Sequence, residues 1–517
     1  MSARWSAVDL RGVPLYWVAT VTLAGRARYY ATEALSITSS VVAGGSVATE
    51  ATLQPVSLRK QGASFGGVPE ARTARITVLP VESPGVWIAE GHILEGQPCE
   101  LALWRAGDTW EQRRVQLRGV IRSASWGAAG EPLELEVEES LVADRLLYPS
   151  PGMVVSTTTW PDAAASAVGL PYPVIVGQPG RTGIAAAPAL YVESVLAGGA
   201  RDLLMVAGHP VVADSVTIYD DSGASESFPV ELLDDGSGQR VAVVDLGLAG
   251  TVAVDPEGSY SSSWESGAGL LAITGTGGAV GAGDVILALL ARSGLVVDSG
   301  QAASARDALN GYLIDAVIDT PTAPSAWIAA ALLPILPAAM VAGADGWWVR
   351  PLPIRPTLAD CIAQLVPGVG VTREGQVTGE GESEIANDLS LRLAIGTETD
   401  DPTIEARLGP TTDGGSHSSA DAVRSASRYG VRTASEESVA LHDLATAYRV
   451  LRWWAQVRAW PRWRMRYVVG PEWAWLEPGD VLRLTDSDLS IDGPVLLDAV
   501  EFQDAGTLLL EVIQWRR

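Results

Sequence analysis

The feature of this sequence that most constrains its fold is a two-residue alternation of apolar and charged side chains. In residues 114–123 apolar residues alternate with Arg and Gln, with one exception at Val120, and in residues 132–139 they alternate with Glu. The apolar rows are Val115, Leu117, Gly119 and Ile121, then Leu133, Leu135 and Val137. This period places one row in a core and the other in solvent, as in half-buried antiparallel strands. If the two strands pair, an Arg row lies beside a Glu row, which favours that register.

Four regions of different character follow one another along the chain. We expect an N-terminal β domain over residues 1–148, a β-rich insertion over 149–275, an α/β module over 276–375 and a C-terminal domain over 376–517. Serines and glycines gather in residues 258–283, which is typical of a boundary. Since strand patterns outnumber helix patterns, the predicted fold class is α+β, mainly β.

Helices are expected only in the last two regions. Helical spacing of apolar residues predicts them at 285–292, 303–314, 357–365 and 436–460, with Asp284 as the first N-cap and Pro461 ending the last helix. Turn residues predict a hairpin loop at 234–238, a tight turn at 343–346 and an exposed loop at 413–420. Strands are expected at 99–105, 172–177, 211–219, 228–233, 240–246, 347–350, 387–394, 464–469, 481–485, 495–502 and 507–515.

The composition excludes several classes of protein. Asp and Glu outnumber Lys and Arg by 61 to 36, a net charge of −25, and affinity for nucleic-acid phosphates comes from basic surface. Two distant cysteines, Cys99 and Cys361, cannot build a disulfide framework or a Cys₄ metal site. The N-terminus shows no secretory signal. The apolar run 326–343 contains Pro334 and Pro337 and lacks basic flanks, so a buried segment is favoured over a membrane span.

Three patterns that resemble catalytic or ligand sites do not meet the spacing those sites need. The glycines from Gly275 lack both the dinucleotide fingerprint and the phosphate-loop lysine. Asp486, Asp488 and Asp492 do not follow the calcium-loop spacing and predict a surface turn. Ser438, His442 and Asp443 fall on one predicted helix, where neighbouring residues point apart, so they cannot form a hydrolytic triad by themselves.

An Arg/Trp cluster near the C-terminus is the most unusual local feature. Ten Arg and Trp residues fall within eighteen positions, among them Trp453, Trp454, Arg458, Trp460 and Trp463. Arg with aromatic rings could stack nucleic-acid bases. In a chain this acidic, an interface with another protein chain is favoured, because Trp and Arg are enriched at such contacts. These five residues are therefore the interface candidates.

The order of motifs in the last 140 residues resembles the C-terminal part of bacteriophage tail hub proteins, the family of tail-tip attachment and baseplate hub proteins. The motifs are Asn387-Asp388, Ser425, Ser427, Tyr429-Gly430-Val431-Arg432, a helix with Ala445 and Ala447, and the turn Leu476-Glu477-Pro478-Gly479-Asp480-Val481. The segments 286–295 and 345–349 resemble the α/β part of the same family, and 172–177 and 91–103 resemble other phage tail segments. Residues 185–275 match nothing recognisable.

This resemblance implies a multidomain tail-hub architecture with two barrel-like tube modules, an α/β module and a β insertion. It implies a structural protein of the virion tail tip, shared with gene transfer agents, that forms a homotrimer and closes the tail tube as a ring. The implied partners are the distal tail or tube protein, the tape measure protein and a central fibre or spike. Phage DNA would pass through the lumen without specific binding, and an acidic chain suits that passage.

No enzymatic activity, cofactor or metal is expected, since two cysteines cannot ligate the iron–sulfur cluster found in some family members. Two alternatives stay open: a tail-associated cell-wall hydrolase, and a distal tail or receptor-binding adhesin. Pro478, Gly479 and Asp480, which match the family turn, are the motif residues carried forward.

Overall fold

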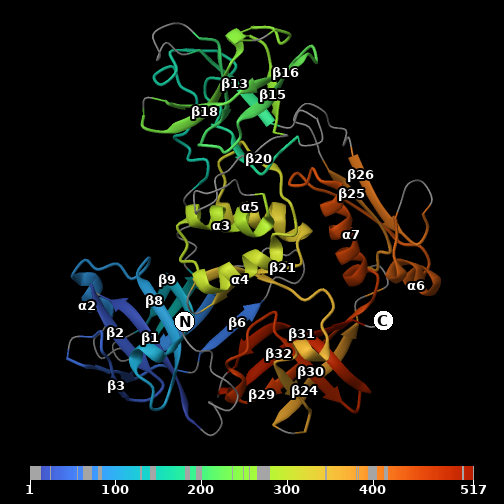
Figure 1. Cartoon of the computed structure of the whole chain (residues 1–517). Coiled ribbons are helices and arrows are strands. Elements are labelled where there is room, and N and C mark those ends of the chain that lie inside the picture. Colours follow the sequence, from blue (N-terminus) through green and yellow to red (C-terminus); the bar gives the residue numbers. More distant parts are fainter. Residues whose placement is uncertain are drawn as a thin grey trace.

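The computed structural model shows an α+β chain dominated by strands, which confirms the predicted fold class (Figure 1). Its largest element is a sheet of fourteen strands drawn from both ends of the sequence. The structure describes residues 13–515 except 24, 43, 55, 62–72, 80–83, 128–130, 140–146, 181–186, 194–200, 236, 249, 256, 265–279, 344–345, 369, 380, 382–383, 394–403, 413–416 and 504–505. The predicted boundary stretch, the turn at 343–346 and the loop at 413–420 therefore lie wholly or partly outside the described residues.

The long sheet has an N-terminal half and a C-terminal half. The N-terminal half contains β1 (Leu15–Leu23), β2 (Arg26–Ala31), β5 (Glu50–Ala51), β6 (Ser57–Gln61), β7 (Thr73–Val78), β8 (Pro98–Arg105), β9 (Arg114–Trp126) and β10 (Leu133–Glu139). The C-terminal half contains β23 (Ala363–Leu365), β24 (Val371–Gly379), β29 (Arg462–Val469), β30 (Val481–Asp486), β31 (Ile491–Phe502) and β32 (Leu508–Trp515). Helix α2 (Pro84–Ala89) buries Trp87 in the core of the first half, and a hairpin of β3 (Ser36–Thr38) and β4 (Ser46–Ala48) completes that region.

The predicted alternation holds in β10 and breaks in part of β9. Leu133, Leu135 and Val137 are fully buried, and the strand pairs antiparallel with β9 as expected. In β9, however, Arg114 and Gln116 are buried instead of solvated. A register shift in the pairing with β8 lies beside them, and Arg114 forms an ion pair with the C-terminal half.

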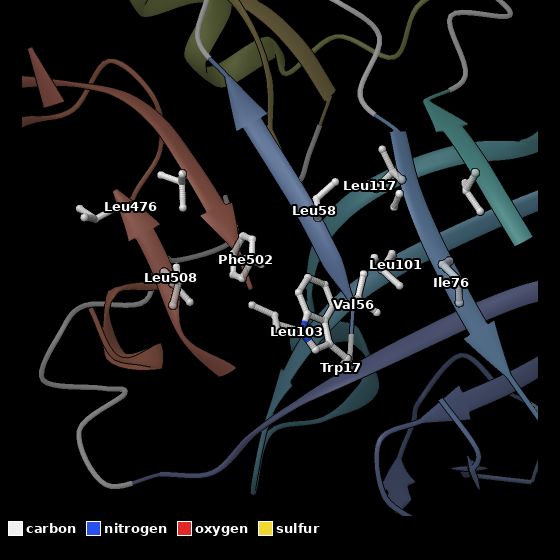
Figure 2. Close-up of a cluster of buried hydrophobic side chains, with 14 of the residues drawn as sticks. Trp17, Val56, Leu58, Ile76, Leu101, Leu103, Leu117, Leu476, Phe502 and Leu508 are labelled. Carbon is white, nitrogen blue, oxygen red and sulfur yellow. The ribbon is translucent and has the colours of Figure 1, made fainter. Parts of the chain in front are cut away.

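The two halves join where β6 pairs antiparallel with the end of β31. On the core side Phe502 packs edge-on against Trp17 with ring centroids 5.2 Å apart, beside Leu58, as Figure 2 shows. Buried side chains of both halves form one hydrophobic cluster across this seam. The two ends of the sequence therefore build a single folding unit.

The insertion is an eight-stranded β structure with its own core. Its strands are β11 (Asp162–Ala163), β13 (Ala187–Glu193), β14 (Leu203–Ala207), β15 (Ser215–Asp220), β16 (Ser225–Pro229), β17 (Glu231–Asp234), β18 (Arg240–Asp245) and β19 (Tyr260–Ser263). β17 and β18 pair antiparallel around the predicted hairpin loop. The strand predicted at 228–233 is instead two strands, because Pro229 has no N–H to continue a ladder.

The α/β module lies between the insertion and the long sheet (Figure 1). It contains α3 (Ala282–Ser293), α4 (Ser299–Leu309), α5 (Pro324–Trp327), β20 (Ala316–Ile318), paired with β12 (Val174–Val176), and the hairpin β21 (Ala338–Gly343) and β22 (Gly346–Pro351). The helix predicted at 357–365 is wrong, since a single helical turn at Leu358–Asp360 leads into β23, which pairs with β30. The apolar run 326–343 is largely buried. No helix in the described ranges is long and apolar enough to cross a membrane.

The last region packs α6 (Ala420–Tyr429) and α7 (Leu444–Arg458) with a small sheet of β25 (Asp388–Leu393), β26 (Ile404–Gly409), β27 (His417–Ser418) and β28 (Thr433–Glu437). The long helix begins at Leu444 and not at Glu436. The Asp443 carboxylate accepts a hydrogen bond from the Thr446 N–H at 2.7 Å and caps the helix there. The preceding residues pair with β25 instead.

Candidate functional site

The indoles of the predicted interface cluster pack inside this chain. Trp453 and Trp454 lie on α7 with 3% and 2% of their surface exposed. The Trp454 Nε1 donates a hydrogen bond to the Pro334 carbonyl at 3.1 Å. Arg458 lies over the Trp454 ring, 4.6 Å from its centroid, and donates to Glu436 at 2.9 Å. The contact with Pro334 fixes α7 to the α/β module, and the contact with Glu436 fixes it to β28.

Trp460 and Trp463 follow the helix. Trp460 is buried, and its Nε1 donates to Asp421 at the start of α6. Trp463 lies on β29, partly buried against the shared core. Of the five candidates, only Arg458 and Trp463 keep substantial exposed surface, so a contact of this cluster with another chain stays a prediction resting on those two residues.

The turn Pro478-Gly479-Asp480 is held by reciprocal backbone hydrogen bonds. The Gly479 N–H donates to the Leu497 carbonyl at 2.7 Å, and the Leu497 N–H donates to the Asp480 carbonyl at 2.8 Å. The buried Asp480 carboxylate also accepts from the Glu477 N–H at 2.8 Å. Gly479 has a φ of +87°, a conformation that favours glycine. The turn thus fixes the start of β30 against β31.

Two arginines from other parts of the chain converge on this turn. Arg350 of β22 donates to the Pro478 carbonyl at 2.8 Å and to Asp480 at 2.6 Å. Arg114 of β9 forms a buried ion pair with Glu477 at 2.6 Å. The turn is therefore a three-way joint between the N-terminal half of the sheet, the α/β module and the C-terminal half.

Sequence reasoning missed both arginines. Arg114 fitted a solvated row, and Arg350 carried no motif. Their partners lie 363 and 130 positions away in the sequence, so no local pattern points to them.

A second polar network joins the other motif residues. The Asn387 side chain is fully buried and donates to Ser425 at 3.0 Å and to the Gly430 carbonyl at 2.9 Å. It accepts from the Arg432 N–H at 2.9 Å. Ser425 in turn donates to the carbonyl of Ala459, just after α7. These residues hold α6, β25 and the end of α7 together, which gives this motif a structural role.

Comparison with known proteins identifies this part of the chain. Residues 398–500 match the family model of putative phage tail proteins. We call these residues the phage tail segment, since they are similar to phage tail proteins. The match confirms the resemblance to phage tail proteins for the region that holds α6, α7, the Arg/Trp cluster and the Pro-Gly-Asp turn.

Solved structures of tail proteins show weaker similarity to the whole chain. A 43 kDa tail protein of prophage MuSo2 from Shewanella oneidensis is 10% identical, with 98% of each chain covered and a TM-score of 0.36. A tail protein from Neisseria meningitidis MC58 is 9% identical, with 97% of this chain and 96% of that chain covered and a TM-score of 0.38. A chain of the native gene transfer agent virion is 16% identical, with 66% of this chain and 84% of that chain covered and a TM-score of 0.41. No curated protein matches the sequence.

Inside the phage tail segment, the residues that resembled a hydrolytic set have separate structural roles. Asp443 caps α7, and Ser438 accepts a hydrogen bond from the Ala440 N–H. The buried His442 accepts from the Gly180 N–H at 3.3 Å through its Nδ1. None of these hydrogen bonds links the three side chains to one another.

Of the three aspartates near the end of the same segment, Asp486 and Asp488 belong to the turn between β30 and β31, whereas Asp492 lies within β31. Asp486 ends β30 and accepts from the Asp488 and Leu489 N–H groups and from the Tyr467 hydroxyl. Asp492 pairs with Arg483 on the neighbouring strand, and this contact lowers the pKa of the Asp492 carboxyl. Within the described ranges no three His, Cys, Asp or Glu side chains are grouped as around a metal ion.

Proposed function

We propose that this chain is the structural hub of a phage tail tip, or of the equivalent part of a gene transfer agent. Three copies would close the tail tube as a ring and connect the distal tail or tube protein and the tape measure to a central fibre or spike. The phage tail family match over residues 398–500 supports a tail component. The finer role rests on the architecture of the chain.

The observation that carries the proposal is the pairing of β6 with β31. It joins a strand group from the start of the chain to one from its end, so each copy presents two curled sheet modules in one continuous sheet. Three copies would then supply six modules, two from each chain, which could close as a pseudo-sixfold ring. Cyclic rings are built from contacts that repeat in this way. The insertion and the α/β module would lie outside this ring of strands.

The proposed role is that of a non-enzymatic component of the virion. We also propose that the chain divides into domains after residues 148, 275 and 375. The separate structural roles of Ser438, His442 and Asp443 support the absence of a triad there.

Two measurements test this assignment. Light scattering of the purified chain is expected to give three times the mass of the 54.1 kDa chain. Cryo-electron microscopy of particles is expected to show threefold density for it at the tail tip. A chain that stays monomeric and is missing from purified tails would overturn the proposal. A lysis zone on host cell wall would favour the hydrolase instead.

A further inference from the structure

The outward face of α7 carries positive charge without a matching acid. Residues that recur every three or four positions on it are Ala445, Tyr448, Arg449 and Arg452, of which Tyr448 is half-buried and the others are exposed. We call these four residues the α7 stripe. The fifteen residues of α7 include three arginines and no Asp or Glu, in a chain whose net charge is −25. The helix is therefore a local exception to the acidity of the chain.

The charges of the stripe are not neutralised by the part of the chain that the structure describes. Arg449 donates a hydrogen bond to the Gly311 carbonyl and lies over the Tyr312 ring, 5.5 Å from its centroid, and neither contact cancels its charge. Arg452 is exposed and has no ion pair with a described residue. Next to these arginines, Tyr448 packs against the ring of His417, with centroids 4.1 Å apart. Arg together with aromatic rings is the composition enriched at contacts between proteins.

The insertion has the opposite charge. Residues 149–275 contain fourteen acidic residues and three arginines, a net charge of −11. Four of the carboxylates come from two neighbouring segments, the end of β15 with its turn and the loop before β19. The Ala253 N–H of the loop donates to the Asp220 carboxylate at 3.3 Å, which joins the two segments. We call this group the acidic tip; its residues are Asp220, Asp221, Asp255 and Glu257.

The acidic tip has no ion pair with a described residue. Asp220 accepts hydrogen bonds from the Ser222 and Ala224 N–H groups, which shape the turn but bring no positive charge. Burial raises the pKa of Tyr260, and the charges of Asp255, Asp220 and Asp221 raise it further, so these carboxylates lie around one hydroxyl. The tip therefore presents uncompensated negative charge.

The α7 stripe and the acidic tip belong to one chain but are not joined within it. No ion pair among the described residues connects them, and Figure 1 shows β15 and β16 in the insertion at the top, with α7 lower down beside the α/β module. In a ring of identical copies, each contact joins one patch of a copy to a different patch of the next copy. Each chain must therefore carry two complementary patches, and a cationic stripe with an acidic tip meets that requirement.

We propose that the α7 stripe of one copy binds the acidic tip of the insertion of the next copy. The inference rests on the proposed function, in which the copies form a ring, and it names the surfaces that join them. Opposite charges on the two surfaces steer the copies together and select their orientation. Val254 beside the tip is 44% exposed and Leu444 beside the stripe is 42% exposed, so both patches also offer apolar area. The insertion would then be an assembly element.

The first test reverses one charge in each patch of the full chain. Arg452→Glu changes the stripe and Asp221→Arg changes the tip. Neither side chain has a hydrogen-bond partner among the described residues, so neither change removes such a contact. The matched controls are Arg407→Glu on β26 and Asp214→Arg at the opposite end of β15, which alter exposed residues outside both patches.

Sedimentation equilibrium measures how strongly the copies associate. At about 50 mM salt we expect each single reversal to weaken association about tenfold or more, because it places like charges across the contact. The chain with both Arg452→Glu and Asp221→Arg should associate more strongly than either single variant, since the two new charges attract. The controls should match the wild type. Unchanged association in the single variants, equal weakening in the controls or no gain in the double variant would overturn the inference.

A second test separates this inference from the hub assignment. In a Cys361→Ser background, in which the other cysteine is buried, copies with Arg452→Cys are mixed with copies with Asp221→Cys. The two variants should form a disulfide-linked pair, whereas Arg407→Cys mixed with Asp221→Cys should not. Threefold density at the tail tip without this crosslink would overturn the inference and leave the hub assignment standing. A crosslink in a chain that is missing from purified tails would support the contact and overturn the hub assignment.

Discussion

The molecule has two joints that differ in how they use polar side chains. The seam between β6 and β31 joins two strand groups through a backbone ladder and apolar side chains such as Trp17 and Phe502. The neck of the insertion, residues 173–180, also has a backbone ladder, between β12 and β20, and buried valines, but polar side chains accept several of its backbone N–H groups. His209 accepts from Ile175 at 3.0 Å, Asp315 from Gln178 at 2.7 Å and His442 from Gly180 at 3.3 Å.

The difference indicates which part of the chain keeps its stability when the pH falls and which part loses it. Apolar burial does not depend on protonation, so the packing of Trp17 against Phe502 at the seam does not change with pH. A neutral imidazole that accepts a hydrogen bond loses that ability when it takes up a proton. The long sheet is therefore expected to withstand acid that loosens the insertion.

The largest effect is expected at the seam. Replacing Phe502 by Ala removes a buried ring and leaves a cavity beside Trp17, which costs about 3–5 kcal/mol of unfolding free energy. Hydrogen exchange of the β6 and β31 amides should speed up together. The control is Phe228→Ala, which empties a site in the core of the insertion and should leave β6 and β31 protected. If each variant lost exchange protection both at the seam and in the insertion, the claim that the two regions are held independently would be wrong.

The next effect is the pH response of the neck. Burial lowers the pKa of His209 from 6.5 to about 4, and the charge of Arg292 also lowers it. The buried neutral ring contributes its full stability above pH 6.5, and this contribution is lost as the pH falls from 6.5 towards 4, to a total of about 3 kcal/mol. The protection of the β12 amides, measured relative to their intrinsic exchange rate at each pH, should therefore fall at pH 4.5 compared with pH 7.5, while that of the β31 amides should change less.

The matched variant is His209→Gln, whose amide oxygen can still accept from the Ile175 N–H. Its neck should lose the pH dependence between 6.5 and 4. An identical pH profile in the variant and the wild type would assign the response to another group.

A smaller effect is expected at the three-way joint. Gly479→Ala places a methyl group 3.0 Å from Arg350 Cδ, in a backbone conformation that costs an L-residue about 1–2 kcal/mol. The control Gly368→Ala has a φ of +91° with open space around it, so it reports the backbone cost alone. Urea unfolding should rank Gly479→Ala as the less stable of the two. The reverse order would mean that Arg350 moves aside without loss.

The smallest effect on stability is expected from the Arg59–Glu511 ion pair across the seam. Arg59 pairs with Glu511 across it, but its side chain is 44% exposed, and exposed ion pairs contribute about 0–1 kcal/mol. Arg59→Gln should therefore shift the urea midpoint far less than Phe502→Ala. A shift as large as that of Phe502→Ala would mean that charge, and not apolar packing, holds the two halves together.

The spacing of apolar residues in the sequence predicted those helices and strands whose formation depends mainly on burying one face. Alternation predicted the β9–β10 pair, and spacing predicted helices near α3 and α4, because burial of one face dictates both. Their bounds differ from the prediction: α3 begins at Ala282 with Gly281 and not Asp284 at its N-cap, and α4 spans Ser299–Leu309 instead of 303–314. Residues 436–443 were expected to be helical, but β28 pairs with β25 and the cap at Asp443 starts the helix later. The helix expected at 357–365 gave way to a strand because Ala363–Leu365 finds a partner in β30.

The candidate site divides in the same way. The Pro-Gly-Asp turn was predicted from its match to the family motif, whose residues are adjacent in the sequence. Its ligands Arg114 and Arg350 could not, because each lies on a distant strand and takes its role only from tertiary folding. The indoles of the Arg/Trp cluster were assigned to an interface, yet Trp453, Trp454 and Trp460 are used inside the chain.

The pairing of β6 with β31 also sets the order of events during synthesis. The two strands are about 440 residues apart in the sequence. At roughly 5–20 residues per second, the ribosome finishes β31 about 20–90 s after β6. Through that interval the β6 edge lacks its final neighbour, and only a chain translated to its last strands can cover it. A prematurely terminated product would keep an open edge for chaperones and proteases, so the seam also selects full-length chains before assembly begins.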